Sequence, residues 1–134
     1  MSPLHTNVDA YLQQLTTAPS SVAARMERDA SQRDFPIVGP QVGALLRWLA
    51  RSIEARHVLE LGSGFGYSAL WLADAVGRRG YVILTEGSKD RAREARERLA
   101  EAGLGERART RPDGKKRVSS RASFEHTPKR LWMP

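Results

Sequence analysis

The stretch His57-Val58-Leu59-Glu60-Leu61-Gly62-Ser63-Gly64-Phe65-Gly66-Tyr67-Ser68 decides the fold of this 134-residue chain. It begins with apolar residues that suit a buried parallel strand, and an apolar helical pattern follows its three glycines. Glycines at such a turn let backbone amides approach a ligand where a helix begins. The stretch therefore predicts a nucleotide-type binding site in an α/β fold.

The spacing of the glycines indicates which kind of nucleotide is bound. A dinucleotide fingerprint, G-x-G-x-x-G/A, requires Gly or Ala five positions after Gly62, and Tyr67 stands there. The pattern is instead E-x-G-x-G-x-G, which places Glu60 near the end of a strand where a carboxylate is otherwise costly to bury. This spacing disfavours a nicotinamide-dependent oxidoreductase.

A second acid follows the next apolar run. Glu86 ends the segment Tyr81-Val82-Ile83-Leu84-Thr85 and lies twenty residues past Gly66. An ionised carboxylate offers paired acceptors, so it can bind both hydroxyls of a ribose. Glu86 is therefore the candidate ribose ligand.

Three segments, residues 36–43, 60–70 and 84–87, resemble the class I S-adenosylmethionine-dependent methyltransferases, specifically the catechol-type O-methyltransferase family. The resemblance covers roughly residues 8–104. It implies an α/β, Rossmann-like doubly wound fold that is truncated here to its N-terminal half. It also implies methyl transfer from S-adenosyl-L-methionine to a hydroxyl of a small-molecule substrate.

The resemblance also implies roles for residues of the glycine turn. Gly62 and Gly64 would pass close to the methionine end of the cofactor, and Ser68 would contact its carboxylate. A first-turn hydroxyl that bonds its own backbone is the alternative for Ser68.

Three further cofactor-binding residues follow from the same likeness. Glu86 would hold the ribose, and Val38 would lie near the amino acid moiety. Val38 can equally be read as part of a turn before a helix with Pro40 at its first position. Glu60 would orient the loop and the ammonium group of the cofactor.

A divalent metal is expected for the family, with acidic ligands after the fourth strand and beyond. The chain lacks those positions, and His5, His57 and His126 are scattered without paired ligand spacing. We therefore predict no metal ligand and assign no catalytic residue. The chain is expected to be weakly active or inactive by itself.

Composition fits one small domain, with 40% apolar residues and no cysteine. The absence of cysteine excludes a disulfide framework and thiol metal sites. No signal-peptide pattern or membrane-spanning apolar run is present, so we expect a soluble cytoplasmic protein without a membrane partner.

The basic charge is concentrated at one end of the chain. Residues 1–104 carry 13 Lys and Arg against 12 Asp and Glu, whereas residues 105–134 carry nine against three. The alternative function is thus a non-enzymatic nucleic-acid-binding protein that acts through its basic tail, with Phe124 and Trp132 stacking on bases. The tail has no organised binding motif, so nucleic acid is not the expected partner. Deleting residues 105–134 would separate the two functions.

Helical patterns flank the central stretch. Asn7 can cap a first helix, and the segment 18–21 starts a second one. Apolar residues at helical spacing then predict a third helix that packs on the sheet, through Val42, Leu45, Leu46, Leu49 and Ile53.

Ser88 can cap a further helix, which Gly103 ends. Its arginines alternate with acids and predict a solvated face, and Glu94 and Arg98 form an i, i+4 pair on its exposed side. These arginines are Arg91, Arg93, Arg96 and Arg98.

The character of the chain changes at Gly105, which sets the predicted division into residues 1–104 and 105–134. A third strand is weakly encoded there because apolar residues are few and Pro112 interrupts the ladder. The remainder reads as a disordered tail. We hypothesise that it is not family sequence and that it arises from a frameshift, which translation of the other two reading frames tests.

The missing fourth strand has a physical consequence. Without it, residues 58–61 form an unpaired apolar edge where a sheet normally has its middle. We therefore expect marginal stability, together with aggregation or a homo-oligomer formed through this exposed sheet edge.

Overall fold

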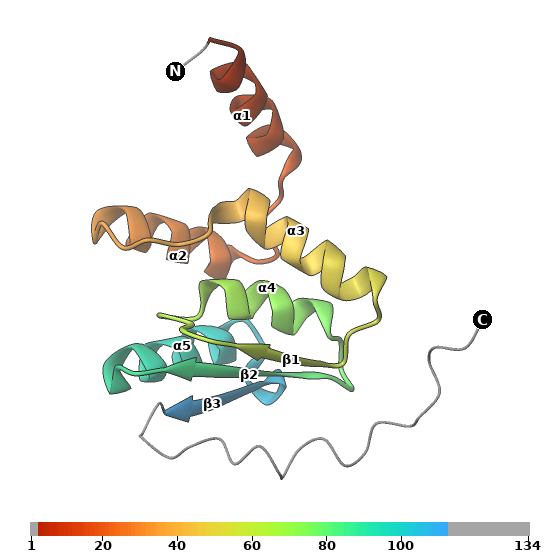
Figure 1. Cartoon of the computed structure of the whole chain (residues 1–134). Coiled ribbons are helices and arrows are strands. Elements are labelled where there is room, and N and C mark those ends of the chain that lie inside the picture. Colours follow the sequence, from red (N-terminus) through yellow and green to blue (C-terminus); the bar gives the residue numbers. More distant parts are fainter. Residues whose placement is uncertain (1–2, 113–134) are drawn as a thin grey trace, which may run out of the picture.

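The computed structural model describes residues 3–112, and within this range the side chains of residues 3–6, 9 and 112 are not described. Helices and three parallel strands form an α/β fold, as the sequence predicts (Figure 1). The helices are α1 (Pro3–Leu15), α2 (Ser21–Gln32), α3 (Gly39–Ser52), α4 (Tyr67–Ala75), α5 (Lys89–Glu101) and the short 3-10 helix η1 (Gly105–Arg107). The strands are β1 (His57–Glu60), β2 (Tyr81–Glu86) and β3 (Ala108–Pro112).

The sheet has the order β1-β2-β3, so β2 is the central strand. Burial alternates along β2: Val82 and Leu84 are completely buried, whereas Ile83 between them is only half-buried. Right-handed crossovers between neighbouring parallel strands place α4 and α5 on the same face of the sheet. Both helices contribute to one core with Val82 and Leu84.

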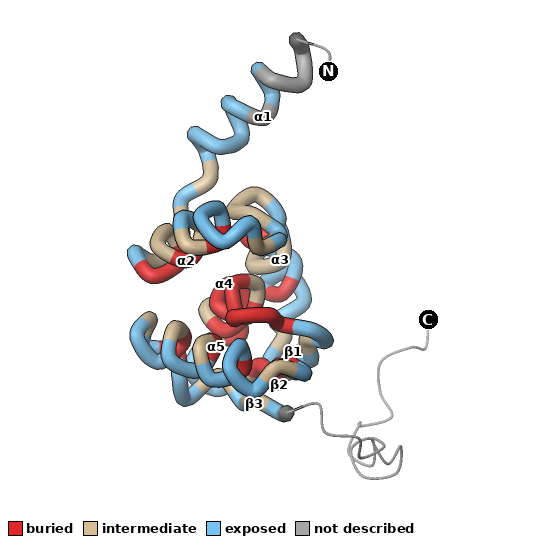
Figure 2. The backbone as a smooth tube through the Cα atoms, turned by 90° about the vertical axis from the view of Figure 1, so that its left-hand side faces the viewer, coloured by how far each residue is buried: buried red, intermediate tan, exposed pale blue. Residues whose placement is uncertain are grey.

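Helix α4 is the centre of that core. It lies between the sheet and α3, and it is the most continuously buried helix (Figure 2). Leu70 and Trp71 are completely buried. The helix is therefore covered on more than one side.

Helix α3 packs differently from the prediction. It contacts α4 through Gly43 and Ala50, because a glycine at position 43 allows the indole ring of Trp71 to lie against the helix backbone. The predicted packing of α3 on the sheet is wrong: it packs on α4. Leu46 does reach the core. The other predicted core residues point outward and are exposed, namely Val42, Leu45, Leu49 and Ile53.

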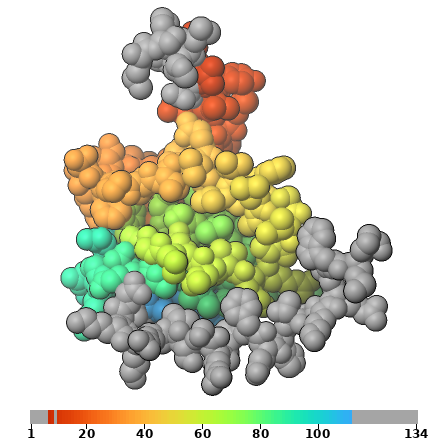
Figure 3. Space-filling model, in the orientation of Figure 1, coloured from red at the N-terminus to blue at the C-terminus, as the bar shows by residue number. Residues whose placement is uncertain are grey.

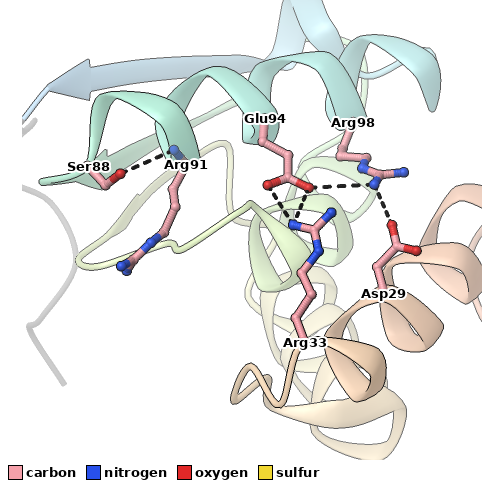
Figure 4. A network of polar contacts seen from close by, with 6 residues as sticks. All are labelled: Asp29, Arg33, Ser88, Arg91, Glu94 and Arg98. Atoms are coloured by element: carbon pink, nitrogen blue, oxygen red, sulfur yellow. Dashed lines mark hydrogen bonds and ion pairs between the residues drawn. The ribbon is translucent and has the colours of Figure 1, made fainter.

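Four charged side chains join α2 to α5 (Figure 4). Arg33 donates to both carboxylate oxygens of Glu94, at 2.9 and 3.0 Å. Arg98 pairs with Asp29 and lies 3.5 Å from Glu94. The Glu94–Arg98 pair is therefore confirmed, but it faces α2 rather than solvent.

Helix starts follow side-chain caps in two cases. Ser88 accepts from the amide of Arg91, as predicted. Ser20, in the segment predicted to start the second helix, accepts from the amide of Ala23. The predicted cap at Asn7 is wrong, since α1 already begins at Pro3.

The folded part continues beyond the boundary predicted at residue 104. Strand β3 pairs with β2 from Val82↔Ala108 to Glu86↔Pro112. Pro112 stands at the last position of the strand, where its missing amide interrupts no further ladder. The strand is thus formed despite its weak sequence pattern.

The rest of the predicted tail cannot be compared in this way. Residues 113–134, with the predicted disorder and the stacking residues Phe124 and Trp132, lie outside the described residues.

One edge and one face of the sheet are uncovered within residues 3–112. Strand β1 pairs only with β2 there, as predicted, and Leu59 on it is 63% exposed. On the face opposite α4 and α5, Tyr81 lies between His57 and Arg109. The centre of its ring is 4.4 Å from the centre of the His57 ring and 3.9 Å from the guanidinium carbon of Arg109. Parallel sheets are normally covered on both faces, so half of this sheet's cover is absent from the described residues.

A buried tyrosine links α4 to α2. The hydroxyl of Tyr67 donates to a carboxylate oxygen of Glu27 at 2.7 Å. Burial, and then the hydrogen bond to Glu27, raise the pKa of Tyr67 well above its ordinary value of 10.0. The folded state therefore holds this proton more tightly than the unfolded chain does.

No helix within residues 3–112 is long and apolar enough to span a bilayer.

Replacing Gly43 with Ala is expected to lower the free energy of unfolding by about 1–3 kcal/mol. The added Cβ would lie 2.4 Å from the indole nitrogen of Trp71, and this overlap outweighs the roughly 1 kcal/mol by which Ala favours a helix over Gly. Urea unfolding measures the difference. Gly87→Ala is the matched control, because nothing lies within 4 Å of its Cβ position. Equal stability of the two variants would contradict the packing of α3 on α4.

The stability of the fold is expected to decline as the pH rises above about 10. The raised pKa of Tyr67 contributes stability that is complete below the unfolded value of 10.0 and is lost above it. Tyr67→Phe should remove this part of the decline and cost about 1 kcal/mol at neutral pH. Tyrosine ionisation is followed by ultraviolet absorbance as the pH rises. The phenol that ionises at the highest pH should be present in wild type and in the control Tyr11→Phe, and absent from Tyr67→Phe.

Candidate ligand-binding site

A cleft of about 360 Å³ lies at the carboxyl ends of β1 and β2. Its volume falls within the range of small-molecule sites, about 300–1,000 Å³. Three parts of the chain meet there: the segment before α3, the glycine turn after β1, and the residues around the start of α5. The lining residues are Phe35, Pro36, Ile37, Val38, Gly62, Ser63, Gly64, Phe65, Tyr67, Ser68, Glu86 and Arg91.

The glycine turn is held against the end of β2. The amide of Ser63 donates to the carbonyl of Thr85 at 2.8 Å, and the amide of Gly62 donates to the Thr85 hydroxyl at 3.2 Å. Gly62 has a φ of +75° and no atom within 4 Å of the position of a Cβ. A side chain there would be strained and would project into open space beside the cleft, so glycine keeps this wall open.

Glu60 fixes the turn from behind the cleft. It is not a lining residue: one of its carboxylate oxygens accepts from the Ser63 hydroxyl at 2.5 Å, and the other accepts from the Ser68 hydroxyl. Both hydroxyls therefore have their only proton directed at Glu60. These two bonds hold the glycine turn to the first turn of α4.

The hydrogen bond to Glu60 limits what Ser68 can do. A serine hydroxyl has one proton to donate and two lone pairs to accept with. With the proton directed at Glu60, Ser68 lines the cleft as an acceptor, so it would have to break this bond to donate to a ligand carboxylate. An ammonium group suits this position as the structure has it.

Glu86 brings a buried carboxylate to the cleft. It is 8% exposed at the end of β2, and one oxygen accepts from the amide of Ser88 at 2.8 Å. The Arg91 guanidinium lies 3.9 Å from the same oxygen. A carboxylate in this position can accept hydrogen bonds from a pair of ligand hydroxyls.

The segment before α3 forms an aromatic wall opposite the turn. The ring of Phe35 lies edge-on to Phe65 with centroids 5.0 Å apart, and it covers Gly64, where an added Cβ would lie 3.1 Å from the ring. The Arg91 guanidinium lies 5.5 Å from the centre of the Phe35 ring. Val38 also lines this wall, half exposed.

The structure thus brings together most of the residues predicted from the sequence. Val38, Gly62, Gly64, Ser68 and Glu86 line one cleft, and Glu60 supports it from behind. Sequence reasoning missed Phe35 and Arg91. Arg91 is one of the arginines predicted to be solvated, although its place in the first turn of the helix that Ser88 caps, shortly after Glu86, could have indicated the cleft.

The described residues do not fit the divalent metal expected for the family. No group of three or more His, Cys, Asp or Glu side chains in residues 3–112 is arranged to hold a metal ion.

The charges of the cleft favour one class of ligand. The carboxylates of Glu60 and Glu86 lie behind and beside it, and the Arg91 guanidinium, 3.9 Å from Glu86, offsets part of the charge at the Glu86 end. The turn next to Glu60 therefore attracts a cationic group more than an anion.

A family model described as Protein-L-isoaspartate(D-aspartate) O-methyltransferase matches residues 21–127. The match continues past Leu104, where the predicted resemblance to the catechol-type family ends.

A catechol O-methyltransferase of Mycobacterium tuberculosis is 37% identical to the chain over 103 residues. The match covers 75% of this chain and 47% of the relative. The chain therefore spans about half the length of this relative.

Solved structures give the same result. The O-methyltransferase TomG of Streptomyces achromogenes, determined in complex with S-adenosylmethionine, is 32% identical with a TM-score of 0.73, over 82% of this chain and 51% of TomG. An O-methyltransferase of Bacillus cereus in complex with S-adenosylhomocysteine is 30% identical with a TM-score of 0.70, over 79% of this chain and 49% of that one. Sequence and structure agree that this chain belongs to the class I S-adenosylmethionine-dependent O-methyltransferase family.

Proposed function

We propose that this chain binds S-adenosylmethionine in the cleft between the glycine turn and Glu86. The observation that most directly supports this proposal is the position of the Glu86 carboxylate. It is buried at the end of β2 and lines the cleft together with Gly62, where the wall is open. In this proposal Glu86 accepts hydrogen bonds from the two ribose hydroxyls. The solved relatives that contain S-adenosylmethionine or S-adenosylhomocysteine support the choice of ligand.

The methionine end of the cofactor lies along the glycine turn in this proposal. Gly62 and Gly64 allow its close approach, and Val38 contacts it from the opposite wall. Its ammonium group donates to the Ser68 hydroxyl, whose own proton is directed at Glu60. The negative charge of Glu60 then stabilises the ammonium through that hydroxyl. This contact replaces the carboxylate contact that the resemblance implies for Ser68.

The reaction that we propose for the complete enzyme is O-methylation. The sulfonium methyl is transferred to a hydroxyl oxygen of a small molecule, the hydroxyl loses its proton, and S-adenosylhomocysteine remains. This chain spans about half the length of its relatives, and its described residues bind and orient the cofactor. Turnover by the chain alone is expected to be weak or absent.

We also propose that the free edge of β1 pairs with a second copy of the chain. Arg56 accepts from the amide of Tyr81, so alternate residues of the strand direct their backbone groups away from β2. Those groups and the exposed side chain of Leu59 form an edge that another strand can extend.

Glu86→Gln is expected to weaken the binding of S-adenosylmethionine at least tenfold. The substitution keeps the shape but loses a charged acceptor, and hydrogen bonds to charged groups contribute about 1.5–3 kcal/mol. Isothermal titration calorimetry with S-adenosylmethionine, S-adenosylhomocysteine and NAD measures it, and NAD should bind poorly to all variants.

The matched control is Glu97→Gln, which lies on the exposed side of α5. Its affinity should equal that of wild type. Folded wild-type protein that ignores S-adenosylmethionine at millimolar concentration would refute the proposed ligand, and unchanged binding by Glu86→Gln would refute the ribose assignment alone.

Leu59→Lys is expected to reduce self-association through the β1 edge. A lysine on an edge strand opposes pairing because its charge would be buried against the second copy. Size-exclusion chromatography with light scattering, at several concentrations, compares the variant with wild type. An unaltered mass distribution, with wild type associating, would exclude the edge as the contact.

A further inference from the structure

Two contacts join the end of α2 to α5. Arg91 and Glu94 are one turn apart on α5 and point to the same side of it (Figure 4). Glu94 binds Arg33, the C-cap residue of α2, and Arg91 lies over the ring of Phe35, two residues further along the chain. In the space-filling view α2 (orange) and α5 (blue-green) lie on the same side of the molecule (Figure 3). The first contact lies outside the cleft, and the second lines it.

The step from Arg33 to Phe35 is rigid. The Phe35 amide donates to the Ala30 carbonyl at 2.9 Å, and the Asp34 amide donates to the Ser31 carbonyl at 3.4 Å. Asp34 has a φ of +48°, so this is the left-handed turn with two reversed hydrogen bonds that ends many helices. A displacement of Arg33 would therefore carry Phe35 with it.

Arg33 also lies behind the aromatic pair of the cleft. Phe35 and Phe65 meet edge-on, and the guanidinium carbon of Arg33 lies 5.9 Å from the centre of the Phe65 ring. A cation at this distance is attracted to the face of the ring. Phe65 is buried and belongs to the glycine turn. Arg33 thus contacts the turn on one side of the cleft and carries the wall on the other.

Glu94 holds Arg33 in this position. One nitrogen of Arg33 donates to both carboxylate oxygens of Glu94, whose side chain is 24% exposed. Arg98 lies 3.5 Å from the same carboxylate and pairs with Asp29, so two carboxylates balance two guanidinium groups. Without the charge of Glu94, Arg33 would lose its partner and would be repelled by Arg98.

We propose that Glu94 is a positioning residue for the cofactor cleft. It holds Arg33 and, through the rigid step, sets the distance between the glycine turn and the wall formed by residues 35–38. Glu94 is not among the residues that line the cleft, so it acts on a ligand only through this wall. The role rests on the proposed function, in which the wall contacts the methionine end of S-adenosylmethionine and Glu86 binds the ribose.

The ribose carboxylate is held independently of the wall. Val38 and Phe35 stand opposite the glycine turn, along which the methionine end lies in the proposed function. Glu86 instead ends the central strand of the sheet and accepts from the amide of Ser88. A displaced wall should therefore weaken a ligand that has an amino acid end and spare a nucleoside that lacks one.

Glu94→Gln is expected to weaken the binding of S-adenosylmethionine about three- to tenfold, the effect of losing one partly exposed ion pair. Binding of 5′-methylthioadenosine, a related nucleoside without the amino acid end, should equal that of wild type. Isothermal titration calorimetry measures both, at a temperature where circular dichroism shows every variant fully folded. The control is Glu97→Gln, whose side chain pairs with Arg93 on the exposed side of α5, and it should bind both compounds as wild type does.

Variants of Arg33 show whether Glu94 acts through it. Arg33→Gln should cause the same loss for S-adenosylmethionine. The double variant Arg33→Gln, Glu94→Gln should bind no more weakly than either single variant, because each substitution removes the same contact. Arg33→Lys should keep most of the affinity, since a single nitrogen of Arg33 contacts Glu94.

Three results would overturn the positioning role: unchanged binding of S-adenosylmethionine by Glu94→Gln, an equal loss for 5′-methylthioadenosine, or losses that add in the double variant. The second of these would indicate a general loosening of the site rather than a shift of the wall. Failure of the proposed function looks different. Folded wild type would then bind neither compound, which would refute the cofactor site and the positioning role together, whereas Glu86→Gln should weaken both compounds if the site is correct.

Discussion

The binding cleft depends on one carboxylate that never lines it. Glu60 ends β1 and accepts the hydroxyl protons of Ser63 and Ser68, one from the glycine turn and one from the first turn of α4. A half-buried carboxylate requires hydrogen-bond donors. The two serines that supply them are thereby held in place, and with them the glycine turn and the start of α4. The same charge then acts on any ligand at the turn, favouring an ammonium group and opposing a phosphate.

A second constraint is that the described part of the sheet is covered on one side only. Helices α4 and α5 share the face on which Val82 and Leu84 are buried, while Leu59 and Ile83 belong to the opposite face. Parallel sheets are normally covered on both faces. The greater length of the relatives therefore matters physically, because the additional residues can provide the cover that is absent here. A chain of twice this length can supply both the second cover and a neighbour for β1. The cleft is nevertheless complete in its lining, because each lining residue comes from residues 35–91.

The sequence predicted what depends on local chemistry and missed what depends on packing partners. The strand, glycine turn and helix follow from the pattern of residues 57–68, and Glu86 follows from its place after the second strand. The direction of α3 could not be predicted by counting large apolar residues, because Leu46 shares its inner face with the small residues Gly43 and Ala50. Strand β3 was underestimated because its stability comes from pairing with β2 rather than from its own composition.

The spacing of the glycines now has a structural explanation. In the dinucleotide fingerprint the third small residue allows close packing of the helix, and Tyr67 occupies that position here. Close approach instead occurs one residue earlier: a Cβ on Gly66 would lie 2.9 Å from that of Ala95 on α5. Tyr67 is thereby free to be large, and its hydroxyl reaches Glu27 on α2 while its ring lines the cleft. Because the close contact is made at Gly66, the next position can hold a large aromatic side chain that is anchored to α2 and forms part of the cleft wall.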